Sequence, residues 1–430
     1  MGGTMSSKRP PSTQPTPNQS ALSRRGWLAS ATATPLAAVL GGCQSAPPAA
    51  DAHAPSPYLA KLGVEPIVNA AGYLTALGGA VMPPEVADAM RAGANVHVPF
   101  YELYEKAGAY IAEVIGVEAA LVSAGAASAA TIATAACMTG TDRDKVHQLP
   151  DTTGMKHEVI IQKNHRQGYD HAPRASGAKF VVVETEQEFR AAFNDKTAMV
   201  YQLGAERHFG KREPGQVPLS LVVAIAKEHG VPVFVDAADE APPKSTLKYY
   251  LDQGVDLVCF SGGKGILGPS STGLLLGRKD LIEAGMLNHM TDSDSVGRGM
   301  KVDKEGIMGL IAAVERFVAL DWAAVEAEWW ARQDRIRGYL EDLPGIKAER
   351  FPEDLEPPHV PRMYVEWDEQ AVGLTRGDVA KKLREGSPHI ATTSSSFGFT
   401  VITATLEPGE EEIVGRRLRE IFQEALGKSG

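Results

Sequence analysis

The sequence predicts an α/β fold in which a large domain holds a mostly parallel sheet of seven strands and a smaller α+β domain follows. Short apolar runs without alternation indicate strands that are buried on both faces. Helical patterns lie between several of these runs, as in sheets covered by helices on both sides. The strands are predicted at residues 119–123, 159–162, 180–184, 199–202, 233–236, 257–261 and 273–276.

The helices are indicated by periodicity and by their end signals. The run 219–229 has a helical period and stops at Gly230, a residue that suits the position just after a helix. From Lys304 to about Tyr339 a long amphipathic stretch is predicted to be helical. The second domain is then predicted as strand, helix, strand and helix, at residues 362–367, 375–385, 397–406 and 410–425.

The composition excludes several classes of protein. Of the 430 residues, 43% are hydrophobic and 22% are charged, which excludes a wholly disordered chain, a collagen-like repeat and a polytopic membrane protein. The net charge of −10 makes the chain a poor candidate for binding a nucleic acid backbone. Three cysteines cannot form a disulfide scaffold. A large protein with a hydrophobic core, of enzyme-like size, is expected.

The first 57 residues carry the features of a targeting segment. Arg24 and Arg25 precede a short, Ala-rich apolar run, which resembles a twin-arginine signal rather than a spanning helix. The run ends in Leu40-Gly41-Gly42-Cys43, which resembles a lipoprotein processing site. We therefore expect a signal over residues 1–43, a flexible tether over 44–57, and export of the bacterial protein to the periplasm or cell envelope, with a possible lipid anchor at Cys43. The alternative is a disordered tail with a chance arginine pair.

Residues that can carry chemistry follow the ends of the predicted strands, where ligands bind in open parallel sheets. After the first strand come Gly125, Ala126, Ala127 and Ser128, small residues that open a helix. Such a turn lets backbone N–H groups approach a phosphate at the helix N-terminus. The alternative is a tightly packed turn with no ligand.

Two charged residues mark two further strand ends. Asp236 ends a buried strand, where a carboxylate is costly to desolvate without a cationic partner, although it could also cap the following helix. Lys264 lies among glycines just past another buried strand, where a walled-in amine has a lowered pKa and can form a Schiff base. A P-loop is excluded because Val258 and Gly265 stand where that motif needs Gly and Ser or Thr.

His165 follows the strand at 159–162 and could stack on a flat cofactor. Close-spaced residues of metal-ligand type are absent from the sequence, so no metal is predicted. A phosphate cup, a stacking residue, an acid for a ring nitrogen and a Schiff-base lysine together predict a pyridoxal phosphate site. Asp236 would keep the ring nitrogen protonated, Lys264 would shuttle the α-proton, and Ser261 could bind the phosphate.

The chain from about residue 58 resembles fold-type I pyridoxal phosphate enzymes of the selenocysteine synthase-like group, in particular the D-glucosaminate-6-phosphate ammonia-lyase-related members. The motifs that carry the resemblance are Val68-Asn69-Ala70-Ala71-Gly72, His165-Arg166, Val235-Asp236-Ala237-Ala238, Phe260-Ser261-Gly262-Gly263-Lys264, Ser271-Thr272-Gly273 and Gly297-Arg298-Gly299-Met300-Lys301. The resemblance implies a large cofactor domain over 58–310, a small domain over 311–430, and a homodimer or larger assembly with active sites between subunits. It also implies that Asn69, Thr75, Arg298 and Lys301 line the substrate side. The family's Pro-Arg-Ile-like segment is Ser387-Pro388-His389-Ile390 here, without the arginine.

The expected reaction is α-deprotonation of a 2-amino-3-hydroxy acid followed by elimination, giving a 2-keto product and ammonia. Aldol cleavage, racemisation and transamination need the same residues, and selenium transfer to a tRNA is not expected of an exported acidic protein. An unphosphorylated amino acid or amino-sugar acid is the favoured substrate, because phosphorylated metabolites are unusual outside the cytoplasm. The alternative of another class is a non-catalytic envelope protein that keeps the fold, against which both Lys264 and Asp236 are present.

Overall fold

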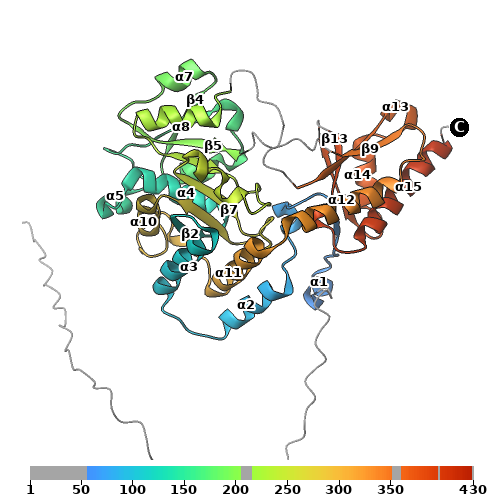
Figure 1. Ribbon diagram of the computed structural model, residues 1–430, viewed down its shortest axis with the longest axis horizontal. Helices are drawn as coiled ribbons and strands as arrows, with labels where there is room; N and C mark the ends of the chain where they lie inside the picture. Colours follow the sequence, from blue (N-terminus) through green and yellow to red (C-terminus); the bar gives the residue numbers. More distant parts are fainter. Residues whose placement is uncertain (1–55, 205–215, 351–359, 396–397, 429–430) are drawn as a thin grey trace, which may run out of the picture. The chain divides into compact units, whose positions relative to one another are not determined.

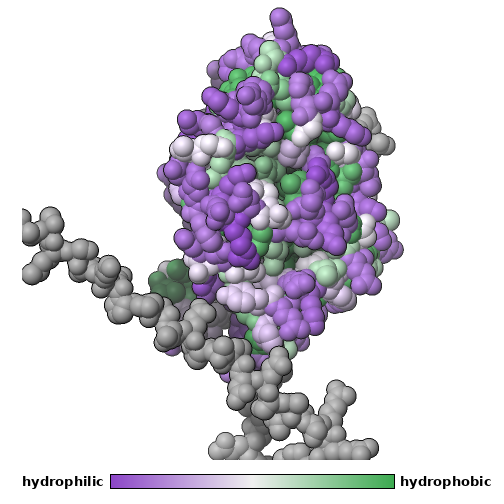
Figure 2. Space-filling view, turned by 90° about the vertical axis from the view of Figure 1, so that its left-hand side faces the viewer, coloured by the Kyte–Doolittle hydropathy of each residue, from purple (hydrophilic) through white to green (hydrophobic). Residues whose placement is uncertain are grey.

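The computed structural model describes residues 56–204, 216–350, 360–395 and 398–428 (Figure 1). The signal predicted over residues 1–43, with Arg24, Arg25 and Cys43, lies outside these residues, as does nearly all of the tether. Within the described part of the chain, no helix is both long enough and apolar enough to cross a membrane. The face seen in Figure 2 is largely hydrophilic, and its hydrophobic residues lie in small separate groups.

The large sheet has seven strands, as predicted. Its strand order is β2-β8-β7-β6-β5-β3-β4, and β8 alone runs antiparallel to its neighbours. The predicted strand positions are confirmed to within two residues. The strands are β2 (Ala119–Ser123), β3 (Glu158–Gln162), β4 (Lys179–Val183), β5 (Thr197–Leu203), β6 (Val233–Asp236), β7 (Leu257–Ser261) and β8 (Gly273–Gly277).

Successive side chains of a strand point to opposite faces of the sheet, and in these strands both sets are apolar. Helices therefore cover both faces. In β7, Leu257 and Cys259 pack in one core with α4 (Gly125–Thr139) and α10 (Lys279–Leu287). Val258 and Phe260 point to the other core, which contains side chains of α3 (Phe100–Ile115), α8 (Leu219–Glu228) and α11 (Lys304–Ala319). The remaining helices of this part are α1 (Pro57–Leu62), α2 (Pro84–Ala94), α5 (Arg143–Gln148), α6 (His171–Ala175), α7 (Glu186–Ala191) and α9 (Thr246–Tyr249).

The helical stretch predicted from 304 to 339 is two helices, α11 and α12 (Trp322–Gly338). Leu320 has extended backbone angles (φ −61°, ψ 141°), which end the first helix. The Asp321 side chain then accepts a hydrogen bond from the N–H of Ala324 at 3.2 Å and caps the second. Good helix formers such as Ala323, Ala324 and Ala327 follow the break, so helical propensity alone does not reveal the N-cap.

The second core surrounds a four-stranded antiparallel sheet of order β12-β13-β10-β9. Val68 and Ala70 belong to this core, because β1 (Val68–Asn69) pairs in parallel with β11 (Ile390–Ala391). The predicted boundary at residue 310 stays a prediction; α11 runs through it, and its buried side chains belong to the core of the large sheet. The elements here are β9 (Ile346–Arg350), β10 (Arg362–Trp367), β12 (Thr393–Ser395), β13 (Gly398–Ile402), α13 (Glu369–Val372), α14 (Arg376–Arg384) and α15 (Glu410–Lys428).

Candidate active site

The carboxyl ends of β2, β3, β6 and β7 lie at the same edge of the large sheet, because these strands run in the same direction. One of the residues predicted to bind the cofactor lies at or just after the end of each of these strands. Gly125 follows β2, His165 follows β3, Asp236 ends β6 and Lys264 follows β7. The topology therefore brings the predicted phosphate cup, stacking residue, acid and lysine to one edge.

Asp236 is buried, with 8% of its surface exposed, and three donors hold its carboxylate. The Tyr201 hydroxyl donates to Oδ2 at 2.7 Å, while the Ala238 N–H and the Cys259 thiol donate to Oδ1 at 3.2 and 3.6 Å. Burial raises the pKa of this carboxyl, and the Tyr201 hydrogen bond opposes that rise. Among the described residues no cationic side chain pairs with it, so a protonated pyridine nitrogen fits this carboxylate as its missing counter-charge.

His165 is buried and neutral. Burial lowers its pKa to about 4. The Leu203 N–H donates to Nδ1 at 3.2 Å, so the proton of the neutral ring is on Nε2, where it can be donated to an acceptor. A neutral, buried ring held at Nδ1 is suited to packing against a flat cofactor.

The start of α4 fits a phosphate. Gly125, Ala126, Ala127 and Ser128 form its first turn, and the preceding Ala124 provides no side-chain cap for their N–H groups. Gly125 has φ +81°, and a Cβ built on it meets no atom within 4 Å. The helix has 15 residues, and its uncapped N–H groups and dipole favour an anion. Ser261, partly exposed at the end of β7, bonds through its own N–H to the Ala238 carbonyl.

Lys264 is carried by a tightly packed turn. A Cβ at Gly263 would lie 2.2 Å from Cα of Ser270, and one at Gly265 would lie 2.1 Å from the carbonyl oxygen of Ala241. The turn closes with a 2.8 Å hydrogen bond from the Leu267 N–H to the Lys264 carbonyl. Burial raises the pKa of the Cys259 thiol, and the charge of Lys264 opposes that rise, so the lysine lies near the thiol that contacts Asp236.

The four residues expected on the substrate side differ in burial. Asn69 is partly buried in β1, and its side-chain amide accepts from the Ala71 N–H and donates to the Gly72 carbonyl, both at 3.0 Å. Thr75, Arg298 and Lys301 are exposed. Within the described ranges no hydrogen bond or ion pair connects these three to Lys264 or Asp236, and their roles stay predictions.

Similarity to a known family covers most of the described chain. Residues 84–360 match the model of the family described as aminotransferase class-V. The chain belongs to the aminotransferase class-V family. The fold-type I architecture and the pyridoxal phosphate cofactor are thereby confirmed, as is the expectation of an enzyme.

This class-V protein is similar to two curated enzymes over most of its length. It is 34% identical to a 5'-C-glycyluridine monooxygenase-decarboxylase from Streptomyces sp., over 84% of this chain and 91% of that one. It is 29% identical to the D-glucosaminate-6-phosphate ammonia lyase of Salmonella typhimurium, over 85% and 98%. A solved structure of a D-glucosaminate-6-phosphate ammonia-lyase superposes with a TM-score of 0.73 at 28% identity, over 86% and 98% of the two chains. The resemblance to ammonia-lyase-related proteins is confirmed.

Tyr201 is a residue of this class-V enzyme's site that sequence reasoning missed. Only 1% of the residue is exposed, and it lies in β5, the strand next to Asp236. In the sequence it belongs to an apolar run, because a phenol resembles its apolar neighbours in a buried strand. The available signal was the hydroxyl itself, since a buried tyrosine O–H usually has a hydrogen-bond partner.

Tyr201→Phe removes one hydrogen bond to the buried carboxylate while keeping the ring in place. A hydrogen bond to a charged group contributes about 1.5–3 kcal/mol, so we expect kcat to fall by roughly ten-fold or more with little change in KM. Steady-state kinetics and the cofactor's absorption band measure this. Tyr250→Phe is the matched control, because Tyr250 is a buried tyrosine that bonds to the Gly204 carbonyl instead. Equal losses in the two variants would contradict a specific role for Tyr201.

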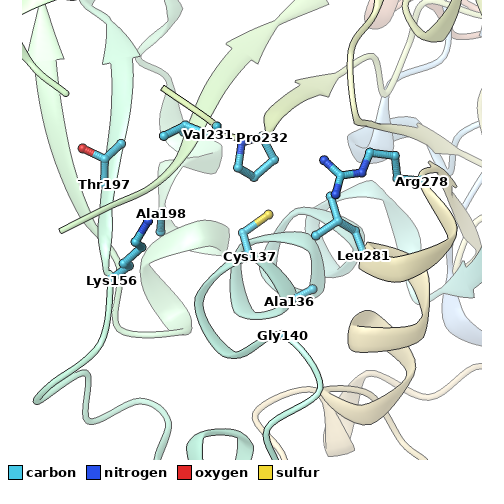
Figure 3. Close-up of a pocket in the computed structure, with 11 residues that line it drawn as sticks. Ala136, Cys137, Gly140, Lys156, Thr197, Ala198, Val231, Pro232, Arg278 and Leu281 are labelled. Atoms are coloured by element: carbon cyan, nitrogen blue, oxygen red, sulfur yellow. The ribbon is translucent and has the colours of Figure 1, made fainter. Parts of the chain in front are cut away.

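A separate pocket of about 200 Å³ opens at the opposite edge of the sheet, where β5 begins (Figure 3). Cys137 and Arg278 line it, and Arg278 is held by ion pairs with Asp256 and Asp280 at 2.8 and 2.6 Å. Burial raises the pKa of the Cys137 thiol, which disfavours the thiolate form that acts as a nucleophile. The class-V enzyme's candidate catalytic groups all lie at the other edge.

Proposed function

We propose that this protein is a pyridoxal phosphate-dependent lyase that deprotonates Cα of a 2-amino-3-hydroxy acid and eliminates it to a 2-keto product and ammonia. The observation that carries the proposal is the position of a buried carboxylate, Asp236, and a lysine, Lys264, at the ends of neighbouring strands. The similarity to D-glucosaminate-6-phosphate ammonia lyase over 98% of that protein supports the choice of elimination among the reactions open to such a site.

Each residue has a task in this reaction. When bound, pyridoxal phosphate supplies an electron sink for the electron pair left on Cα. Asp236 holds a proton on the ring nitrogen, and the donors around its carboxylate oppose the rise in pKa that burial causes. Lys264 Nζ takes the α-proton and can return it to the β-hydroxyl as that group leaves as water. The first turn of α4 holds the phosphate.

A second candidate is an oxygen-dependent decarboxylation. The relative with 34% identity is a monooxygenase-decarboxylase, and the similarity covers 84% of this chain and 91% of that protein. Both reactions start at Cα, but one releases ammonia without oxygen and the other consumes oxygen and releases carbon dioxide. Their products therefore distinguish them.

The test is a substrate screen with the cofactor-loaded enzyme. The amino acids are serine, threonine and D-glucosaminate, each assayed with and without oxygen, with Lys264→Ala as the blank. The lyase predicts ammonia and keto acid at equal rates in both atmospheres. Oxygen uptake with carbon dioxide release would replace the lyase by the second candidate. Aldehyde formation or α-proton exchange alone would indicate aldol cleavage or racemisation. A colourless protein that cannot be loaded with cofactor would favour a binding protein.

The protein is further proposed to act as a homodimer or larger assembly. Large apolar side chains of the segment before α2 are exposed, including Tyr58 at 66%, Leu62 at 74% and Val81 at 64%. This segment also contributes Asn69 and Thr75, the residues expected at the substrate side. A partner subunit that covers these side chains would remove the apolar area from water. Sedimentation of the purified protein tests this.

Export to the cell envelope is proposed from the sequence of residues 1–43. Replacing Arg24 and Arg25 by lysine keeps the charge but removes the arginine pair of a twin-arginine signal. We expect the double variant to remain in the cytoplasm while retaining its cofactor. Fractionation of cells that express the variant and the wild type measures this, with Cys43→Ala tested separately for the lipid anchor. Unchanged envelope localisation of the double variant would contradict the proposal.

A further inference from the structure

A pocket of about 330 Å³ adjoins the turn that carries Lys264. One wall is Leu267, which closes that turn by its hydrogen bond to the Lys264 carbonyl. A second wall is the segment 67–81, joined to the turn by a 3.0 Å hydrogen bond from the Ala80 N–H to the Gly263 carbonyl. The third wall is the connection between β13 and α15, with Ala404, Thr405 and Glu407.

The polar groups of this pocket are largely used within the protein. The Asn69 amide is held by Ala71 and Gly72, and the Thr405 hydroxyl donates to the Asn69 carbonyl at 2.7 Å. The Tyr73 hydroxyl donates to the Ala404 carbonyl at 3.4 Å. These bonds shape the pocket, and they leave few donors to receive an anion.

The charge of the lining is negative. Its twelve described residues include one carboxylate, Glu407, and no lysine, arginine or histidine. Arg332 lies close to the lining, because its guanidinium donates to the carbonyl of Leu406, which stands between Thr405 and Glu407; it is also paired with Glu328 at 3.1 Å and does not line the pocket. A second basic side chain, His389, comes directly before β11. Its Nε2 lies 2.9 Å from Oε2 of Glu65, and its Nδ1 lies 2.6 Å from the Arg384 carbonyl oxygen. His389 is therefore engaged elsewhere and does not line the pocket.

We infer that this pocket receives the end of the substrate distant from the amino acid group, and that it selects a hydroxylated or amino-bearing end over a phosphate. A phosphate dianion placed beside Glu407 without a lining cation meets repulsion and gains no charge-assisted hydrogen bond. A hydroxyl or ammonium group can donate to the Glu407 carboxylate. The inference rests on the proposed function, since it identifies the substrate class of the same site.

The test compares the binding of D-glucosaminate and D-glucosaminate 6-phosphate to the cofactor-loaded enzyme by titrating the cofactor's absorption band. Four proteins are used: the wild type, Glu407→Gln, Glu407→Arg and the control Glu349→Gln. Glu349 is an exposed glutamate of β9 that does not line the pocket. The wild type is expected to bind the unphosphorylated acid at least about ten-fold more tightly, and Glu407→Arg to lower or reverse that ratio, while Glu349→Gln leaves it unchanged.

Equal or tighter binding of the phosphorylated acid by the wild type overturns the inference. So does a ratio that Glu407→Arg leaves unchanged, or a failure of both acids to bind. Ammonia release is measured separately on the same samples. A binding preference as expected without ammonia release leaves the pocket assignment intact and contradicts the lyase instead.

Discussion

Lys264→Ala should abolish both the covalent attachment of pyridoxal phosphate and turnover. The lysine follows β7, the strand next to β6, which ends at the buried Asp236. Because it also handles the α-proton, the rate should fall by about three orders of magnitude or more. Borohydride reduction followed by peptide mass spectrometry checks the attachment, and ammonia release checks the rate.

The matched control is Lys279→Ala, which removes an exposed lysine on α10. It should keep the wild-type absorption band and a reduced cofactor adduct on the peptide that contains Lys264. An adduct on another peptide, or an unchanged band in Lys264→Ala, would refute the assignment of the Schiff-base lysine.

Asp236→Ala should lower kcat by roughly 10²–10³-fold while cofactor still binds, more weakly. In the proposed function the buried carboxylate is the counter-charge for the ring nitrogen, whereas the uncapped first turn of α4 is expected to hold the phosphate independently. Without the carboxylate the ring loses its proton and is a weaker electron sink. Kinetics and cofactor affinity are measured together, and near wild-type kinetics would exclude this role.

The cofactor-free protein gives a second readout of Asp236. Burial raises the pKa of its carboxyl in the folded state, so the folded chain holds more protons than the unfolded chain as the pH rises above the usual range of an aspartate. The free energy of unfolding therefore falls with rising pH through this window. Asp236→Asn removes that titration, so its melting temperature should fall less between about pH 4 and pH 8 than that of the wild type. Identical pH profiles of the two proteins would contradict a raised pKa of the Asp236 carboxyl in the folded state.

Much of the large domain was predictable because buried strands have a simple signal. The runs 119–123, 233–236 and 257–261 coincide with β2, β6 and β7, since apolar residues without alternation occur where both faces are covered. The direction of β8 was not predictable, because side-chain pattern does not encode strand polarity. The strand β9 was missed because its exposed alternate residues dilute the apolar signal.

The candidate site was predictable where a residue type is rare in its sequence context. A carboxylate that ends an apolar strand and a lysine that lies among glycines are both rare, and the structure puts Asp236 and Lys264 at adjacent strand ends. Tyr201 could not be found in this way, because its partner is set by the β5–β6 register. The pocket beside Leu267 joins segments more than 300 residues apart in sequence, and no local pattern reports such a contact.

The pairing of β1 with β11 has a consequence for the order of events in synthesis. Val68 and Ala70 belong to a core whose other members come from residue 336 onward, and the Thr405 hydroxyl bonds to the Asn69 carbonyl across 336 residues of sequence. Closing so long a loop is entropically costly and slow, and the ribosome must first release nearly the whole chain. The segment that carries Asn69 therefore acquires its strand partner β11 and its hydrogen bond to Thr405 last. A polypeptide truncated before β11 leaves β1 without its strand partner, so the pocket beside Lys264 is complete only when the C-terminal part of the chain has been made.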